Sequence, residues 1–338
     1  MKNLLKMNNH LLGLLVLCAI SFTSCSKDDD PAPPKEKQTD VYVVGTVFEG
    51  THIAKLWKNG VATNLSDGST EVYPTDVFVS GADVYVSGYD YNGTTATAKL
   101  WKNGVATNLT NGTKSASAQS IYVSGTDVYV AGYEVSGIQT VAKLWKNGVA
   151  TNLTDGSKYA QANSVYVSGS NVYVSGHDGD VATIWKNGVS INLTDGSNPA
   201  SATSVYVEDD VVYATGYKRN GSVAQAIFWR NGLATNLSDG ANNAFGNAVY
   251  VSDGNTYVVG REFNGTRYVI KLWKNGVVTN VSDELKNSFA GSVFAVGGNV
   301  YVTGSEGDVA TVWKNGVATK LSNSIRSAAG AIFVTQTN

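Results

Sequence analysis

Cysteine and histidine are scarce in this sequence, and no familiar catalytic motif occurs. The 338 residues include only two cysteines and three histidines. Two cysteines exclude a framework of several disulfides and a zinc site built from several cysteines. No H-E-x-x-H, G-x-S-x-G or phosphate-binding glycine loop is present, so the motifs of several enzyme classes are missing. A formal net charge of −2 provides no general electrostatic attraction for nucleic acids.

The apolar run nearest the N-terminus is short. Leu11–Ile20 follows Lys2 and Lys6, and it is too short to span a bilayer comfortably. The small residues Ser21, Thr23 and Ser24 follow it. A positively charged start, a short apolar core and small residues predict a secretory signal peptide over residues 1–24.

The residues after this segment suggest a lipid anchor. Phe22–Cys25 resembles a relaxed bacterial lipobox, which implies that Cys25 becomes the lipidated N-terminus. Ser26–Asp30 is similar to the acidic export signal of Bacteroidota surface lipoproteins, which implies an outer-membrane protein exposed on the cell surface. An ordinary secreted protein with a merely solvated charge run is the alternative. The polar, proline-containing residues 25–39, which include this cysteine, are expected to be a flexible tether.

All seven tryptophans lie in one repeated motif. The spacing between successive tryptophans is 44 or 40 residues, and a period of this size indicates a repeat architecture. Six copies read W-K-N-G and one reads W-R-N-G; they begin at Trp57, Trp101, Trp145, Trp185, Trp229, Trp273 and Trp313.

Each repeat predicts four β-strands. Valine and tyrosine alternate in the pattern of a pleated strand packed on both faces. The Asn-Gly pair after each tryptophan favours a two-residue hairpin turn, because both residues tolerate positive φ. In the third repeat the predicted strands a, b, c and d are Ser120–Ser124, Asp127–Ala131, Val141–Lys146 and Val149–Leu153.

Residues 40–338 are similar to seven-bladed β-propellers. Four-stranded units of about 40–45 residues are typical of propeller blades. The chain enters at Asp40–Val43 as a strand b without its strand a, and ends with Ala331–Val334 as a strand a without b, c or d. We therefore expect an all-β ring in which C-terminal strand a pairs with N-terminal strands b, c and d, which removes both open sheet edges.

Aromatic residues shared by every repeat are expected to be core. The seven tryptophans and one strand-b tyrosine per repeat predict aromatic packing between neighbouring blades, rather than an aromatic ligand cage. These tyrosines are Tyr42, Tyr85, Tyr129, Tyr173, Tyr213, Tyr257 and Tyr301.

The repeats differ mainly in their b–c and d–a loops, which share one face of a propeller. Unequal aromatic and polar groups at one mouth of a funnel are what a binding site needs, although neutral drift of surface loops is an alternative. Positions sixteen residues after each tryptophan are expected to precede the innermost strand and to rim the funnel. The candidate ligand-binding residues are Tyr73, Gln161, His177, Arg219, Phe245 and Phe289.

These features predict a non-catalytic binding module that recognises a glycan or another ligand at this face. A protein-interaction scaffold is the main alternative, and a hydrolase or lyase with its site in the same loops is a weaker one. Asp178/Asp180 and Glu306/Asp308 are the nearest approach to paired carboxylates, but they lie in separate hairpins. We therefore predict no catalytic residue, no metal and no cofactor. The expected partners are a glycan or an extracellular protein, with no nucleic acid, and the protein is expected to be a monomer.

Overall fold

Each tryptophan motif forms the end of one strand and the tight turn into the next. In the turn after Trp145, Asn147 and Gly148 have φ angles of 51° and 81°. This is the left-handed region that a two-residue hairpin turn requires. The equivalent asparagine and glycine have positive φ in all seven motifs, so the predicted hairpins are confirmed.

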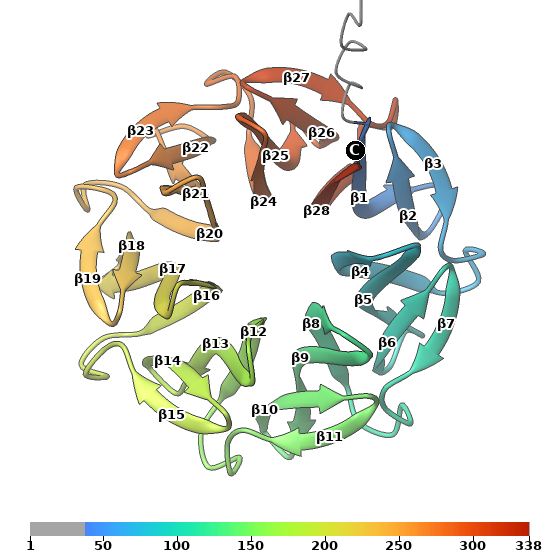
Figure 1. Ribbon diagram of the computed structural model, residues 1–338, viewed down its shortest axis with the longest axis horizontal. Coiled ribbons are helices and arrows are strands. Elements are labelled where there is room, and N and C mark those ends of the chain that lie inside the picture. The colour runs from blue at the N-terminus through green and yellow to red at the C-terminus, as the bar shows by residue number, and fades with distance from the viewer. Residues whose placement is uncertain (1–37, 338) are drawn as a thin grey trace, which may run out of the picture. The chain divides into compact units, whose positions relative to one another are not determined.

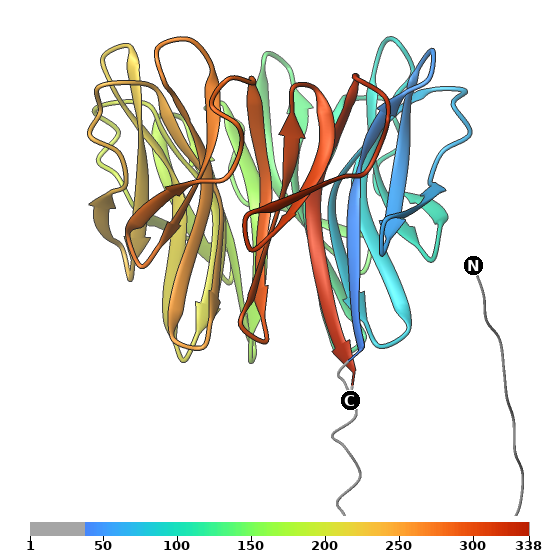
Figure 2. The same ribbon diagram turned by 90° about the horizontal axis from the view of Figure 1, so that it is seen from above.

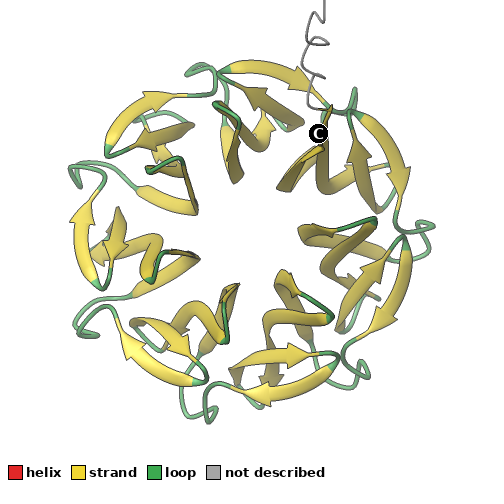
Figure 3. Ribbon diagram, viewed as in Figure 1, coloured by secondary structure: helices red, strands yellow, loops and turns green. Residues whose placement is uncertain are grey.

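Residues 38–337, which the computed structural model describes, form a ring of seven four-stranded antiparallel sheets (Figures 1 and 3). We number the sheets as blades 1–7 and name their strands a to d from the axis outwards. Blade 1 contains β28 (Ser327–Thr337), β1 (Gln38–Phe48), β2 (His52–Lys58) and β3 (Val61–Asn64). Blade 2 contains β4 (Glu71–Ser80), β5 (Asp83–Tyr91), β6 (Ala96–Lys102) and β7 (Val105–Asn108). Blade 3 contains β8 (Ala116–Ser124), β9 (Asp127–Ser136), β10 (Gln139–Lys146) and β11 (Val149–Asn152).

The other four blades repeat this order. Blade 4 contains β12 (Ala160–Ser168), β13 (Asn171–Asp178), β14 (Val181–Lys186) and β15 (Val189–Asn192). Blade 5 contains β16 (Ala200–Glu208), β17 (Val211–Asn220), β18 (Val223–Arg230) and β19 (Leu233–Asn236). Blade 6 contains β20 (Ala244–Ser252), β21 (Asn255–Phe263), β22 (Tyr268–Lys274) and β23 (Val277–Asn280). Blade 7 contains β24 (Ser288–Val296), β25 (Asn299–Glu306), β26 (Val309–Lys314) and β27 (Val317–Lys320). The expected all-β, seven-bladed propeller is confirmed.

The two ends of the ring close it as expected. Strand β28 pairs with β1 from Gln38 opposite Thr337 to Val47 opposite Ser327. Strand β1 begins two residues before the predicted start of the propeller at Asp40. Within the described range there is no helix long and apolar enough to cross a membrane. The predicted signal peptide, Cys25 and most of the tether lie outside the described residues.

The ring has two distinct faces. The a–b turns lie at what we call the bottom face, where β28 ends and β1 begins; the b–c turns and d–a loops rise to the opposite, top face (Figure 2). The inner strands reach further towards the top than the sequence pattern predicts. In blade 3, strand a begins at Ala116 and strand b continues to Ser136. A bulge between Ala118 and Ser120 shifts the register and lets the pairing continue above it.

Aromatic side chains fill the spaces between blades, as predicted. The motif tryptophans are 1–2% exposed and the seven strand-b tyrosines 3–8% exposed. Trp101 of blade 2 donates a hydrogen bond from Nε1 to the carbonyl of Leu65, 3.2 Å away, at the end of the preceding repeat. The basic residue of every motif stands over the strand-b tyrosine of its blade; Lys58 lies 5.2 Å from the ring of Tyr42.

A second set of aromatic residues forms a closed circle around the axis. Each strand a contributes one ring near the bottom face, and neighbouring ring centroids are 4.4–5.2 Å apart all the way round. The seven residues are Phe78, Tyr122, Tyr166, Tyr206, Tyr250, Phe294 and Phe333. Burial raises the pKa of the four phenols well above the ordinary value. This circle holds the inner strands together.

One carboxylate lies in the inner layer at a position where blades 3–5 have a serine hydroxyl. Asp76 accepts hydrogen bonds from Ser120 Oγ at 2.9 Å and from the Ile121 amide at 3.0 Å, both in the next blade. In blade 3, Ser120 itself accepts one from the Val165 amide at 3.2 Å. Asp76 is only partly exposed, and burial raises its pKa to about 6.

Replacing Asp76 by serine, the residue of blades 3–5 at this position, is expected to stabilise the protein at pH 7.5. A carboxyl group whose pKa is raised on folding weakens stability as pH rises from about 4 through 6, because its ionised form is disfavoured in the folded state. We expect Asp76→Ser to gain about 1–2 kcal/mol at pH 7.5 and nothing at pH 4. Urea unfolding at both values measures this.

Asp127, which is partly exposed in the a–b turn region of blade 3, provides a control in which the pKa shift has the opposite sign. Its hydrogen bonds and ion pair with Lys146 lower its pKa, so its contribution is present at neutral pH and fades in acid. Asp127→Asn should therefore be less stable than wild type at pH 7.5 and approach it near pH 3. Equal stability of Asp76→Ser and wild type at pH 7.5 would contradict the role assigned to Asp76.

Candidate functional site

The blade-specific residues meet at the top ends of strands a and b. Every strand b contains a glycine at the same position. The residue after this glycine lies directly opposite one residue of strand a, and we call these seven couples the rim pairs. Written as strand a/strand b from blade 1 to blade 7, they are Ala328/Thr46, Tyr73/Tyr89, Ser117/Tyr133, Gln161/His177, Ser201/Tyr217, Phe245/Arg261 and Phe289/Ser305. The strand-a members lie inside their strands, so the expectation that they precede the innermost strand is wrong.

Blades 1 and 2 bring a row of aromatic rings to the top face. Tyr73 stacks on Tyr89 with ring centroids 5.1 Å apart. The ring of His52, in blade 1, also lies with its centroid 5.1 Å from that of Tyr73. Phe48 extends the row, 5.3 Å from His52. Burial, with a hydrogen bond from the Tyr73 hydroxyl to Glu71, raises the pKa of Tyr73 to about 12. Tyr73 is therefore neutral at physiological pH and presents a hydroxyl beside a flat apolar surface.

Gln161 and His177 form the rim pair of blade 4. Gln161 Nε2 donates to the Tyr159 hydroxyl at 2.7 Å, and the His177 ring stacks on Tyr159 at 5.7 Å. His177 Nδ1 lies 3.2 Å from Ser201 Oγ in the next blade. Burial lowers the pKa of His177 below its ordinary value, which favours the neutral imidazole at pH 7.

Phe245 and Phe289 flank an arginine that the sequence analysis did not select. The Arg261 guanidinium lies 5.2 Å from the ring of Phe245, 5.0 Å from Tyr268 and 4.9 Å from Phe289. Its Nε is buried without a hydrogen-bond partner, and burial lowers its pKa. Among residues 38–337 no carboxylate forms an ion pair with it. Three aromatic rings surround this cation.

Arg219 lies apart from these groups. It is partly exposed near the end of strand b in blade 5, where its Nη1 donates to the carbonyl of Ser222 in the adjoining turn at 3.1 Å. Of the six predicted residues, Gln161 and His177 are therefore a direct pair, and Phe245 and Phe289 share Arg261. Tyr73 and Arg219 belong to other parts of the top face.

A pocket of about 390 Å³ opens where blade 7 meets blade 1. The strand-b rim residues Thr46 and Ser305 are small here, whereas the other five blades place tyrosine, histidine or arginine at the equivalent position. The missing side-chain volume leaves the space open. The lining residues are Thr46, His52, Phe289, Ser305, Asp308, Arg326, Ser327 and Ala328.

Three further pockets lie at blade boundaries away from the rim pairs. Their volumes are about 330, 650 and 520 Å³, and each is lined by a motif tryptophan: Trp273, Trp101 and Trp229 respectively. Most of their lining residues recur in several repeats. These grooves therefore follow from the repeat itself, while the pocket between blades 7 and 1 depends on residues that differ between blades.

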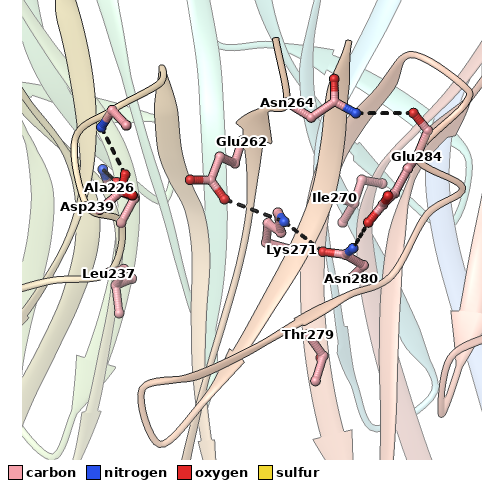
Figure 4. Close-up of polar contacts among 12 residues, drawn as sticks. Ala226, Leu237, Asp239, Glu262, Asn264, Ile270, Lys271, Thr279, Asn280 and Glu284 are labelled. Carbon is pink, nitrogen blue, oxygen red and sulfur yellow. Dashed lines mark hydrogen bonds and ion pairs between the residues drawn. The ribbon is translucent and has the colours of Figure 1, made fainter. Parts of the chain in front are cut away.

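Two acidic residues near the top of blade 6, Glu262 and Glu284, bond to other side chains of the fold (Figure 4). Lys271 Nζ lies 3.5 Å from Glu262 Oε2 and donates to Asn280 Oδ1 at 2.7 Å. Asn280 donates in turn to Glu284, whose carbonyl also accepts from Asn264 Nδ2 at 3.3 Å. This network joins strands b, c and d of the blade to both top loops.

The carboxylates considered as a possible catalytic pair, Asp178/Asp180 and Glu306/Asp308, lie in different blades and have different surroundings. Glu306 accepts from the Asp283 amide at 2.9 Å and from Lys286 Nζ at 3.0 Å, while Asp308 lines the pocket between blades 7 and 1. Asp178 and its neighbours belong to blade 4. In the described part of the chain no three His, Cys, Asp or Glu residues are grouped so as to hold a metal ion.

Some residues of the top face were not predicted from the sequence: Arg261, His52, Arg326 and the strand-b tyrosines of the rim pairs. The sequence did contain a signal for the strand-b members of the rim pairs. From blade 1 to blade 7 the residue after the strand-b glycine is Thr, Tyr, Tyr, His, Tyr, Arg and Ser. Variation at one position inside an otherwise constant strand marks it as blade-specific. Arg326 and His52 had no such signal, since only ring closure brings them to the same pocket.

No protein-family model matches the sequence, and the search of curated proteins found no match. Among solved structures, the chain is similar to one in "Crystal structure of Nidogen/Laminin Complex", with a TM-score of 0.45 and 9% sequence identity. The similarity covers 88% of this chain and 98% of that chain. A likeness this distant says nothing about the ligand of the present protein.

Proposed function

We propose that this protein is a non-catalytic binding module that recognises a glycan at the top face of the propeller. The rim pairs carry this proposal: strands and turns are nearly identical between blades, yet the side chains at this one level differ. Flat aromatic surfaces there alternate with an imidazole, a guanidinium and hydroxyls. Recognition sites combine apolar walls with a few polar groups in this way.

We propose further that Cys25 anchors the protein by lipid to the outer membrane, on the cell surface. Strand β1 begins at the bottom face, so a tether that precedes Gln38 joins the ring on the side opposite the rim pairs (Figure 2). Such an anchor leaves the top face directed away from the membrane. In detergent phase partitioning the full-length protein should enter the detergent phase and Cys25→Ser should remain in the aqueous phase; equal partitioning would remove the anchor.

A glycan array probed with the full-length protein tests the binding proposal. Phe289 is 37% exposed and lies at the rim, and loss of an aromatic ligand contact costs about a factor of ten in affinity. We expect Phe289→Ala to weaken a saturable glycan signal by about that factor. Leu233→Ala, an exposed residue of the outer strand β19, should leave it unchanged. Silence across the array would count against the proposal, and release of a cleaved glycan would favour the hydrolase or lyase alternative.

One observation favours the alternative function as a protein-interaction scaffold. The first residue of every strand d is aliphatic and 69–78% exposed, which gives the outer rim seven equivalent apolar positions. They are Val61, Val105, Val149, Val189, Leu233, Val277 and Val317. A protein partner bound there should produce crosslinks spread over several blades and should be insensitive to Phe289→Ala.

A further inference from the structure

The pocket between blades 7 and 1 combines one aromatic wall with positive charge. Phe289 lines it and is 37% exposed, and the same ring contacts Arg261 of blade 6. Arg326 lines it as well; its guanidinium lies 3.7 Å from the ring of Phe48 and is exposed. Neither arginine forms an ion pair within residues 38–337. Both guanidinium groups therefore keep their capacity to bind an anion.

Hydroxyl and imidazole groups complete the lining. Thr46 and Ser305 place two hydroxyls in the pocket wall, and Asp308 adds one exposed carboxylate. The hydroxyl of Ser327, which also lines the pocket, is bonded to the Ser324 carbonyl and the Ala310 amide. His52 also lines the pocket, and its Nδ1 is buried without a hydrogen-bond partner. A buried polar atom without a partner is costly, so a ligand that bonded to it would regain that free energy.

The volume is suited to a small ligand or to one or two units of a polymer. Pockets that bind such molecules commonly measure about 300–1,000 Å³, and this one measures about 390 Å³. A pyranose ring that carries a carboxylate matches every part of the lining. Its apolar face can cover Phe289, its hydroxyls can bond to the serine, threonine and aspartate groups, and its carboxylate can pair with an arginine.

We propose that the pocket between blades 7 and 1 is a subsite for an acidic sugar, a uronic-acid unit of a glycan, with Phe289 as its platform and Arg326 as its carboxylate partner. This inference rests on the proposed glycan-binding function and names the class of glycan. Arg261 acts as a positioning residue, because it contacts Phe289 from blade 6 and adds a second positive charge beside the pocket.

Isothermal titration calorimetry of the full-length protein in detergent tests the subsite. The probes are a trimer of galacturonic acid and a trimer of galactose with the same linkage. We expect the acidic trimer to bind at least about tenfold more tightly than the neutral one, and its affinity to fall with added salt. Arg326→Gln should remove most of this preference, since a charge-assisted hydrogen bond is lost. Lys114→Gln removes the same charge from an exposed top loop between blades 2 and 3 and should change nothing.

Filling the pocket provides a second test. Ala328 is exposed and holds the rim position that Tyr73 holds in blade 2. Ala328→Tyr should abolish binding of the acidic trimer while the melting temperature stays that of wild type. Equal binding of both trimers, unaffected by Arg326→Gln, would overturn the acidic-sugar subsite but leave the proposed glycan binding standing. Binding of a glutamate-rich peptide with no binding of either trimer would overturn both.

Discussion

Deletion of Ala331–Asn338 is expected to lower the melting temperature by more than about 10 °C. The deletion removes most of β28 and with it the inner strand of blade 1. Ile332 and Val334 are 4% and 3% exposed, and Phe333 belongs to the aromatic circle around the axis. Each buried aliphatic side chain contributes about 1.5–3 kcal/mol. The total loss is therefore comparable with the whole stability of an ordinary domain, about 5–15 kcal/mol.

The deletion also opens the ring. Strand β1 would lose its partner along Gln38–Val44 and expose an unpaired edge to other chains. Differential scanning calorimetry measures the loss, and deletion of Gln336–Asn338 alone is the matched control. Of the residues that this shorter deletion removes, Gln336 is partly exposed and Thr337 is exposed, so the deletion should cost little. A full deletion that melts with the wild type would show that blade 1 does not need its C-terminal strand.

Gly132→Ala is expected to destabilise the protein by about 3 kcal/mol or more. A Cβ atom at this position would lie 2.0 Å from the carbonyl oxygen of Ser117 in the neighbouring strand. The bulge in strand a after Ala118 brings that carbonyl close to strand b. Because the obstacle is backbone, no rotamer change can relieve it. The same approach, 1.9–2.4 Å, recurs at the equivalent glycines of the other blades: Gly45, Gly88, Gly176, Gly216, Gly260 and Gly304.

Gly125→Ala is the control for this substitution. Gly125 lies in the a–b turn of the same blade with φ of 60°, and no atom lies within 4 Å of a Cβ built there. The cost is therefore the backbone conformation alone, about 1 kcal/mol. Denaturant unfolding of both variants compares them directly. Equal destabilisation would mean that the bulge relaxes to admit a side chain and would contradict the close approach.

Repetition explains why the architecture could be predicted from local patterns. The Asn-Gly turn, the alternating strands and the period of 44 or 40 residues each depend on residues close together in the chain. The incomplete first and last repeats predicted ring closure, and β28 pairs with β1 as expected. The buried tryptophans and strand-b tyrosines followed from their presence in all seven repeats.

Local sequence patterns did not predict the full length of the inner strands. The predicted strand a of blade 3 began at Ser120, whereas β8 begins at Ala116. The bulge before Ser120 interrupts the alternation of the pattern, so the upper part of the strand resembled a loop. For the same reason Tyr73, Phe245 and Phe289 were placed before the inner strand instead of within it.

The repeat, the turns, the blade core and the closing of the ring were predictable from the order of residues, because they depend on neighbouring residues and on patterns shared by every copy. How the blade-specific residues combine depends on the folded ring. Arg261 lies between Phe245 and Phe289 because adjacent inner strands converge at the axis. His52 and Arg326 share a pocket because closure brings the two ends of the chain into one blade. Contacts between residues so far apart in the chain leave no periodic signal, so they appear only once the ring is complete.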